Sequence, residues 1–435
     1  MKRVHEKRIW TRLLVISIMI LAAVTVPATS RVEAVKIEWL YLAGADATEL
    51  RNQALAEAFE RENPEITVER IRVISNYADR LATLLATGTA PDVISLDMTY
   101  ISAFGDERFL HDLWPLIERT PEYQIEYVAQ PMLDVFTIDG KLFAAPATAN
   151  PTAYVFNADL FERSGLVSPY DLYMDDEWTW DAFRQAARKL TRKYPDGRFE
   201  SLGARLHLPR TWMFSNGGRE VDDPHRPTTS YFSLDENVEA LKFVRSLIIE
   251  DDVMRPSGRT MTEAIGGDHI SGFVQGKLGM STHWLSYLPA LGEGGGINMG
   301  LVPYPKGPAP GGRYATDLGM FGVAITRTTP NLEAAWRFVS FITGPEGAAL
   351  ASALAGMTPS RPANLDWMGQ LVFNPEVYAD LLIHGTIRVI SRNQTDIQRI
   401  IDDELAQVWA GTVPVENAVV EIDRRIQAYL EQNPQ

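Results

Sequence analysis

The hydrophobic pattern alternates along the first part of the chain in the way that strands require. Residues 35–41 and 66–69 alternate apolar and polar side chains, and residues 92–97 have a continuous apolar centre. Between these segments, apolar residues share one face over residues 50–59 and again over 81–86, which predicts two helices. The order strand, helix, strand, helix, strand indicates an α/β fold with a parallel sheet, in which ligands bind beyond the carboxyl ends of strands.

Later segments continue this mixture of strands and helices. A hairpin turn is expected at Asp139-Gly140, and the small, proline-punctuated stretch 146–151 is a candidate hinge before a strand that resumes at Tyr154. A further strand is expected over 320–325, after a glycine- and proline-rich loop at 292–312. Apolar periodicity predicts helices at 179–190, 235–249, 332–342, 395–409 and 414–430.

The N-terminus has the pattern of a secretory signal peptide. Residues 1–12 carry five Lys or Arg, residues 13–26 form an uncharged apolar run of 14, and a small-x-small site ends at Ala34. The run is shorter than the roughly 20 residues that a spanning helix needs, which disfavours the alternative of an uncleaved anchor. We therefore expect residues 1–34 to be a cleaved signal peptide, although a cut after Ala28 is also consistent with the pattern.

Composition and charge then narrow the functional class. The chain has 46% hydrophobic and 22% charged residues, which is typical of a folded globular protein. The absence of cysteine excludes disulfides, thiolate chemistry and a cysteine-linked lipid anchor. The segment 1–34 holds six basic and two acidic residues, so its removal lowers the net charge from −15 to −19. This acidity disfavours nucleic-acid binding, and the sequence predicts a free periplasmic protein.

Catalytic and metal-binding motifs are missing from the sequence. No HExxH, GxSxG or Walker-type GxxxxGK[ST] pattern occurs, and the seven histidines never fall at zinc-ligand spacing. Short acidic runs do occur, but sequence neighbours do not reveal paired catalytic carboxylates, so we interpret each run as a solvated turn or helix end. The sequence therefore predicts no metal, no cofactor and no enzymatic activity.

Four motifs follow one another in a fixed order along the mature chain. They are Phe59-x3-Asn63-Pro64-x-Ile66-x-Val68, the run from Leu85 to Val93, the run from Phe273 to Met280 with Trp284 behind it, and the segment from Gly322 through Trp336 to Arg361. Each motif is weak alone, but their order and spacing resemble the extracellular solute-binding proteins of ABC importers. The resemblance is to the sugar-binding group, typified by maltose-binding protein.

The resemblance implies a two-lobed periplasmic-binding-protein fold, with each lobe a mainly parallel sheet flanked by helices and a multi-segment hinge between them. By analogy, residues 35–147 and 313–360 form the N-terminal lobe. Residues 148–312 and 361–435 form the C-terminal lobe. The hinges are then expected near 147–151, 311–316 and 359–362.

The resemblance also implies a function and partners. The protein is expected to be a monomer that captures a mono- or oligosaccharide and delivers it to ABC permease subunits, which work with a cytoplasmic ATPase. Alternatives are a binding protein for a polyol or glycerol phosphodiester, a secreted carbohydrate-active enzyme, and a sensor that serves a receptor kinase. The identity of the sugar depends on loops such as 209–223 and 284–312, where sequence spacing is uninformative.

A sugar site needs aromatic rings for C–H faces and planar polar groups for hydroxyls. Trp284 occupies the family position of a stacking aromatic, Asp97 ends a buried strand as a hydroxyl acceptor, and Arg361 lies at the last hinge. Gly319 would let the backbone approach the ligand. The expected ligand-binding residues are Tyr41, Asp97, Tyr100, Asn150, Tyr154, Trp212, Asn216, Trp284, Asp317, Gly319 and Arg361, whereas Trp180, Trp336 and Phe338 are expected in the core.

Overall fold

The computed structural model describes most of the predicted mature chain. The described residues are 34–43, 46–293, 296–354, 360–361 and 366–433. The predicted signal peptide therefore lies almost wholly outside the described residues, as does most of the expected hinge at 359–362.

The N-terminal lobe begins with the predicted alternation of strands and helices. Strand β1 (Val35–Leu42) pairs in parallel with β2 (Ile66–Val73) on one side and with β3 (Val93–Asp97) on the other. The connections contain α2 (Asp46–Glu62) and α3 (Tyr77–Thr87). Apolar periodicity thus predicted this part of the fold correctly, because each element buries one apolar face against the sheet.

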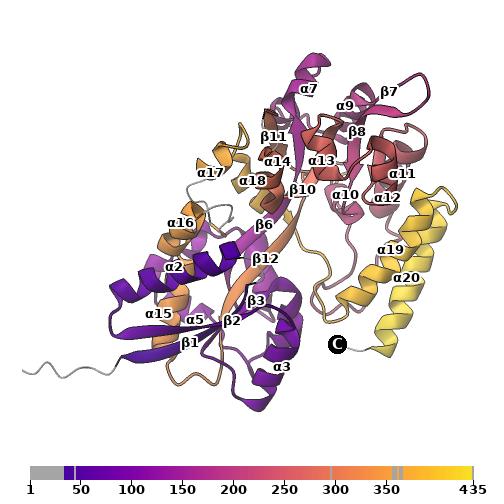
Figure 1. Cartoon of the computed structure of the whole chain (residues 1–435). Coiled ribbons are helices and arrows are strands. Elements are labelled where there is room, and N and C mark those ends of the chain that lie inside the picture. Colours follow the sequence, from indigo (N-terminus) through magenta and orange to yellow (C-terminus); the bar gives the residue numbers. More distant parts are fainter. Residues whose placement is uncertain (1–33, 44–45, 294–295, 355–359, 362–365, 434–435) are drawn as a thin grey trace, which may run out of the picture.

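Two long strands continue from this sheet into the rest of the molecule. Strand β12 (Thr316–Ile325) lies antiparallel between β3 and β6 (Ala145–Asn157), so a late segment of the chain completes the first sheet. Figure 1 shows the orange β12 beside the purple β3 and β6. The stretch 146–151 was predicted as a candidate hinge before a strand that resumes at Tyr154; the predicted interruption is wrong, because the stretch is the first half of the continuous strand β6, and its role as a hinge stays a prediction.

The second half of β6 belongs to the C-terminal lobe. There β6 pairs antiparallel with β10 (Leu278–Trp284) and with β11 (Met299–Val302), and β10 pairs in parallel with β8 (Phe199–Leu206). The result is one 11-stranded sheet with the main order β2-β1-β3-β12-β6-β10-β8-β7. Strand β11 lies inside the segment 292–312, which was predicted as a loop throughout. The prediction missed this strand because it has only four residues and the segment around it is rich in glycine. The short strands are β4 (Thr137–Ile138), β5 (Lys141–Leu142), β7 (Arg192–Lys193), β9 (Met254–Pro256) and β13 (Gly385–Thr386).

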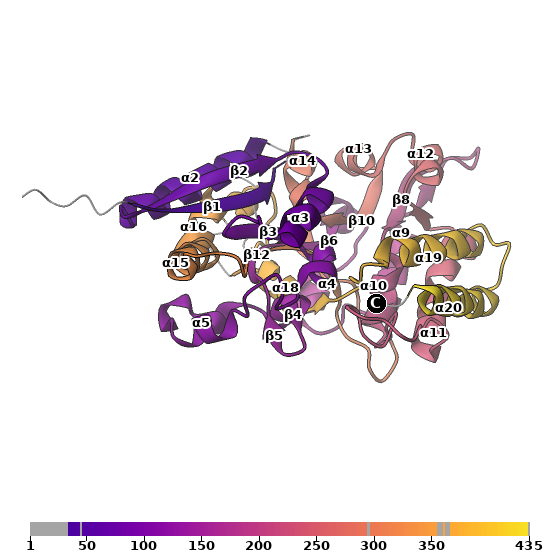
Figure 2. The same cartoon turned by 90° about the horizontal axis from the view of Figure 1, so that it is seen from below.

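Helices cover both faces of this sheet, as Figures 1 and 2 show. Those of the first half of the chain are α4 (Ile101–Phe104), α5 (Trp114–Glu118), α6 (Gln130–Phe136), α7 (Ala158–Arg163), α8 (Pro169–Met174), α9 (Trp180–Leu190) and α10 (Pro209–Ser215). Those of the second half are α11 (Asp235–Ile249), α12 (Arg259–Ile265), α13 (His269–Val274), α14 (Leu288–Gly292), α15 (Leu332–Thr343), α16 (Pro345–Ala353), α17 (Asp366–Gly369), α18 (Val377–Ile383), α19 (Gln394–Trp409) and α20 (Val415–Gln432).

The buried apolar side chains form two clusters: the first extends from the N-terminal lobe into β8 and β10 through Leu202 and Leu278, and the second lies in the C-terminal lobe. The first contains Trp39 and Phe338, whose rings pack edge to face at 5.1 Å, and the second contains Trp180 and Trp212. Helix α18 contributes Tyr378 to the first cluster. No helix within the described residues is long and apolar enough to cross a membrane.

Candidate functional site

A cavity of about 510 Å³ lies in the C-terminal lobe. Its Trp284 side is next to β6 and β12, the crossing strands, which run from one lobe into the other. It contains Trp284 from the end of β10, Arg210 from α10, and Arg388 from the segment between β13 and α19. Helix α19 forms a further wall with Gln398 and Asp402. A second cavity of about 290 Å³ shares several of these residues and extends to His207 and Phe232.

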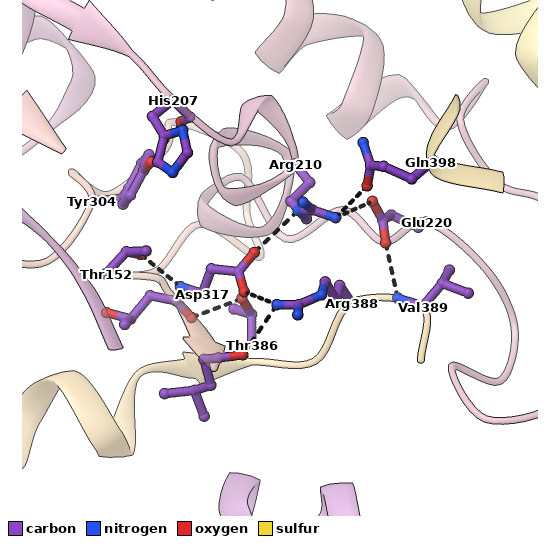
Figure 3. Close-up of polar contacts among 12 residues, drawn as sticks. Thr152, His207, Arg210, Glu220, Tyr304, Asp317, Thr386, Arg388, Val389 and Gln398 are labelled. Atoms are coloured by element: carbon purple, nitrogen blue, oxygen red, sulfur yellow. Dashed lines mark hydrogen bonds and ion pairs between the residues drawn. The ribbon is translucent and has the colours of Figure 1, made fainter. Parts of the chain in front are cut away.

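The centre of the site is a buried carboxylate, Asp317, on strand β12. Its Oδ1 atom accepts a hydrogen bond from Arg388 Nη1 at 2.8 Å, and its Oδ2 atom lies 3.1 Å from Arg210 Nε. Its backbone N–H donates to Thr152 Oγ1 at 3.1 Å, and Figure 3 shows the two guanidinium groups approaching it from different sides. Because ion pairs shielded from water hold their geometry, Asp317 fixes both arginines beside the cavity.

Glu220 completes this network on the far side of Arg210. Arg210 Nη1 lies 3.9 Å from Glu220 Oε1 and donates to Gln398 Oε1 at 2.7 Å, while Val389 N–H donates to Glu220 Oε2 at 3.1 Å. Burial alone would lower the Arg210 pKa, but the charges of Asp317 and Glu220 outweigh burial and raise it. Burial raises the pKa of the Glu220 carboxyl, against the opposing charge of Arg210. Arg210 is therefore permanently cationic beside the cavity.

The indole of Trp284 is held in place by the crossing strands. A Cβ atom added to Gly319 would lie 3.3 Å from Trp284 Cζ3, so the ring packs against the backbone at this glycine. Asn150, which pairs with Gly319, accepts from Ser286 N–H and donates to Ser286 Oγ, both at 3.0 Å. This fixes the turn that directly follows Trp284. The expected space for a ligand at Gly319 is thus filled by the indole ring.

The turn from β8 into α10 places two further groups at the cavities. Leu208 has φ = 50°, a left-handed conformation that is costly for a bulky side chain and is characteristic of functional sites. The turn brings His207 to the smaller cavity and Arg210 to both. Burial, followed by the charges of Arg205 and Arg210, lowers the His207 pKa to about 3, so its imidazole is neutral at ordinary pH.

The structure brings together four of the residues predicted from the sequence. Trp284 lines the larger cavity, and Asn150, Asp317 and Gly319 lie in the strands that support it. In the N-terminal lobe, Asp97 caps the turn at 98–100 through hydrogen bonds to Thr99, and Tyr100 stacks on Tyr77. Both are partly exposed near the lobe's α3 and α4, which Figure 2 places on the side toward α10 and α19, so they stay predictions.

The predicted cleft position of two aromatic residues is wrong. Tyr154 and Trp212 have no exposed surface, and their rings pack together at 6.1 Å within the C-terminal core. Trp212 also packs against Phe183 at 5.0 Å and Tyr304 at 5.7 Å. Their large apolar rings contribute to the buried cluster of the C-terminal lobe.

Three further residues that were predicted to contact the ligand also lie inside the lobes. Asn216 is buried and bonds Glu236 O, Glu239 Oε2 and Ala309 N–H, so it fastens the loop around 307–313 to α11. Arg361 is buried, donates to Thr343 O and Gln124 O, and lies over the Tyr123 ring. Tyr41 donates to Glu49 at 2.8 Å in the N-terminal lobe. These bonds explain the three residues as structural anchors, contrary to the ligand contacts expected from the sequence.

Sequence reasoning missed Arg210, Glu220, Arg388 and Gln398. The available signal was weak: Arg210 follows closely the carboxyl end of β8, a strand that the pattern analysis did not recognise. Arg388 and Glu220 lie in irregular segments, so neither helix nor strand periodicity indicates their direction. Within the described residues no cluster of three or more His, Cys, Asp or Glu side chains has the arrangement of a metal site.

Comparison with known proteins identifies the family of this chain. The family model of bacterial extracellular solute-binding proteins matches residues 46–349, so the chain belongs to this family. A binding protein of Brucella abortus (strain 2308) is 24% identical over 299 residues, which are 67% of either chain. The mannitol-binding protein of Pseudomonas aeruginosa is 26% identical over 209 residues, covering 46% of this chain and 45% of that protein.

Solved structures show the same fold. The sugar-binding protein MalE from Xanthomonas citri superposes with a TM-score of 0.76 and 18% identity, over 91% of this chain and 98% of that one. The cyclic α-maltosyl-1,6-maltose binding protein from Arthrobacter globiformis gives a TM-score of 0.75 and 18% identity, over 92% and 100% of the two chains. The fold is therefore the two-lobed fold of solute-binding proteins.

Replacing Asp317 tests its role as shared counter-ion. We expect Asp317→Asn to lower the free energy of unfolding by about 3–5 kcal/mol, because two largely buried guanidinium groups lose their common partner. Urea unfolding followed by fluorescence measures the change. Glu65→Gln is the control, since its ion pair with Arg337 is exposed and should contribute little. Equally small changes in the two variants would contradict the role assigned to Asp317.

The neutral state of His207 predicts a pH dependence. Its pKa falls from 6.5 to about 3 on folding, so between these values the unfolded chain binds a proton that the folded protein does not. Stability should therefore fall as the pH falls through this window. His207→Gln should reduce the slope by up to about 1.4 kcal/mol per pH unit, measured by urea unfolding between pH 7 and 4. An unchanged slope would show that folding does not lower the pKa of His207.

Proposed function

We propose that this protein is the substrate-binding component of an ABC importer and that it captures a mono- or oligosaccharide. The observation that carries the proposal is the placement of the Trp284 indole and two fixed guanidinium groups, Arg210 and Arg388, in one cavity. An aromatic ring stacks on the C–H face of a sugar, and planar cationic donors bind its hydroxyl groups. The same cavity thus supplies both kinds of wall that a sugar needs.

The donors at the cavity are oriented before a ligand arrives. Arg388 Nη1 is used by Asp317 and by Leu318 O, which leaves its other N–H groups free for hydroxyls. Gln398 is held between Arg210 and Asp402 and presents a further amide at the same wall. Fixed donors lower the entropy cost of binding, which favours tight capture of a flexible, polar ligand. The adjoining cavity of about 290 Å³ offers room for a second sugar unit.

The named ligands of similar proteins support a carbohydrate or a close relative. They include the cyclic maltosyl-maltose of the Arthrobacter globiformis protein and, for the Pseudomonas aeruginosa relative, the polyol mannitol. By the same reasoning we propose that the protein acts as an exported monomer, free in the periplasm, and hands its ligand to permease subunits. Its two lobes would close over the ligand by bending at β6 and β12.

The alternative of an enzyme that hydrolyses a glycosidic bond is not favoured. Glu220, whose pKa is raised by burial, and Asp402 line the same cavity, and glycosidases use a carboxylic acid and a carboxylate together. Glu220 is only 3% exposed and is bonded by Val389 N–H, which leaves it poorly placed for proton transfer to a sugar. Release of reducing ends from an oligosaccharide panel, lost in Glu220→Gln, would replace the binding proposal.

Calorimetry with a panel of sugars and mannitol tests the binding proposal. At least one member should bind with a measurable heat and a change in tryptophan fluorescence. Trp284→Ala should then weaken binding by roughly 30-fold, about 2 kcal/mol, because a stacked ring in a desolvated pocket is lost. Trp284→Phe should retain most of the affinity, since it keeps an aromatic face.

Trp336→Phe is the matched control, because Trp336 lies in the core of the N-terminal lobe and bonds Thr120. It should leave the affinity unchanged. Absence of binding by every sugar and polyol would refute the proposed ligand class. Equal affinity of Trp284→Ala and the wild type would refute the stacking role while leaving the ligand class in place.

A further inference from the structure

Arg205 is a buried cation without a counter-ion. The residue is 5% exposed, its Nε donates to Ser257 Oγ at 2.8 Å, and its Nη1 donates to the carbonyl of Thr282. Among the residues that the structure describes, no carboxylate lies within ion-pair distance of it. Hydrogen bonds to neutral oxygens satisfy its donors but do not balance its charge, and an unbalanced buried charge is costly.

Three histidines surround this arginine. His207 and Arg205 lie two residues apart on β8 and the turn after it, and His269 and His283 have ring centres 5.1 Å apart. His283 is 1% exposed, and neither of its ring nitrogens has a hydrogen-bond partner. Burial, followed by the charge of Arg205, lowers the pKa of each imidazole, so all three are neutral at pH 7. The cluster therefore holds one fixed positive charge and several unused polar atoms.

The groups that face Arg205 from other elements do not neutralise it. Tyr154, Tyr287 and Tyr304 are uncharged phenols, and burial raises the pKa of Tyr154 and Tyr304 further. The charge of Asp268 raises the Arg205 pKa, but Asp268 is exposed and caps α13 by accepting from Ser271 N–H. Burial lowers the Arg205 pKa to about 10, which still leaves the guanidinium charged at neutral pH.

The cluster adjoins the cavity described above. His207 lines the smaller cavity, and the His207 ring lies 6.5 Å from the Trp284 ring, centre to centre. His269 is half-buried and Tyr287 is 41% exposed, so the outer side of the cluster reaches solvent. A sugar that stacks on Trp284 therefore lies next to the His207 side of this cluster.

We propose that the cluster of Arg205, His207, His269 and His283 is a subsite for an anionic group of the bound saccharide, so that the ligand is an acidic sugar. This inference rests on the proposed function. A carboxylate supplies the missing counter-ion of Arg205 and accepts hydrogen bonds from imidazole N–H groups. Because the cluster carries one fixed charge, a monoanionic carboxylate balances it, whereas a dianionic phosphate needs a protonated histidine as well.

Matched pairs of sugars test the inference by calorimetry at pH 7. The pairs are glucose with glucuronate, galactose with galacturonate and mannose with mannuronate. In at least one pair the acid should bind ten times more tightly than the neutral sugar. Raising the salt concentration should weaken binding of the acid and leave the neutral sugar unaffected, since ion pairing is screened. Glucose 6-phosphate is the phosphate arm, and tighter binding of it than of any uronate would overturn the choice of a carboxylate.

Arg205→Gln should abolish the preference for the acid over its neutral partner. Arg255→Gln is the matched control: Arg255 lies opposite Arg205 in the neighbouring strand β9 but is already paired with Asp252. This control should keep the preference. Because Arg205 lacks a counter-ion, its replacement by Gln removes no ion pair, and the variant should fold and unfold near the wild-type temperature.

The outcomes separate this inference from the proposed function. Neutral sugars that bind as well as their acids overturn the acidic subsite and leave the sugar-binding proposal intact. If neither neutral nor acidic sugars bind, the proposed function itself fails. Should Arg205→Gln not fold, His269→Gln replaces it, because the half-buried His269 is less involved in the core. Loss of part of the acid preference in that variant supports the subsite, and an unchanged preference contradicts it.

Discussion

The antiparallel pairing of β6 with β12 is the constraint on which the rest of the molecule depends. Both strands pass from one lobe into the other, so the two lobes are joined by paired backbone. Any relative movement of the lobes must bend or twist this pair. The pair contains Asn150, Asp317 and Gly319, which support the cavity, so the proposed hinge and the proposed binding site share these residues.

The ion pairs of Asp317 connect the proposed ligand site to strand β12. Arg388 donates to Asp317 Oδ1 and to Leu318 O, so one guanidinium is bonded to two successive residues of β12. A hydroxyl group that contacts Arg388 would act on a guanidinium whose hydrogen bonds end on β12, and Arg210 is connected to the same strand by its ion pair with Asp317. In the proposed function, a ligand that contacts these arginines differently in the open and closed arrangements would shift the equilibrium between the two positions of the lobes.

The apolar pattern predicted the elements that bury one regular apolar face. It failed for segments whose apolar residues do not recur at helix or strand spacing. It predicted β1, α2, β2, α3 and β3 because each has a regular apolar stripe. It failed at β6, since Pro146 and Pro151 argue against a central strand, yet both lie within one. For the site, a tryptophan in the core and a tryptophan at a cavity look alike in sequence: Trp212 and Trp284 were both predicted as ligand contacts, and only the second lines the cavity. Arg210 and Arg388 were missed because their common partner, Asp317, lies far from both along the chain.

The central position of β12 also has a consequence for how the chain folds. In the N-terminal lobe, Ile94 pairs with Ala324, so the sheet begun by the first hundred residues stays incomplete until more than two hundred further residues are available. Closing so long a loop costs entropy before any contact rewards it, and chains dominated by such contacts fold slowly. Slow folding keeps a newly made polypeptide unfolded for longer. An unfolded chain is the form that can be threaded through a narrow translocation channel.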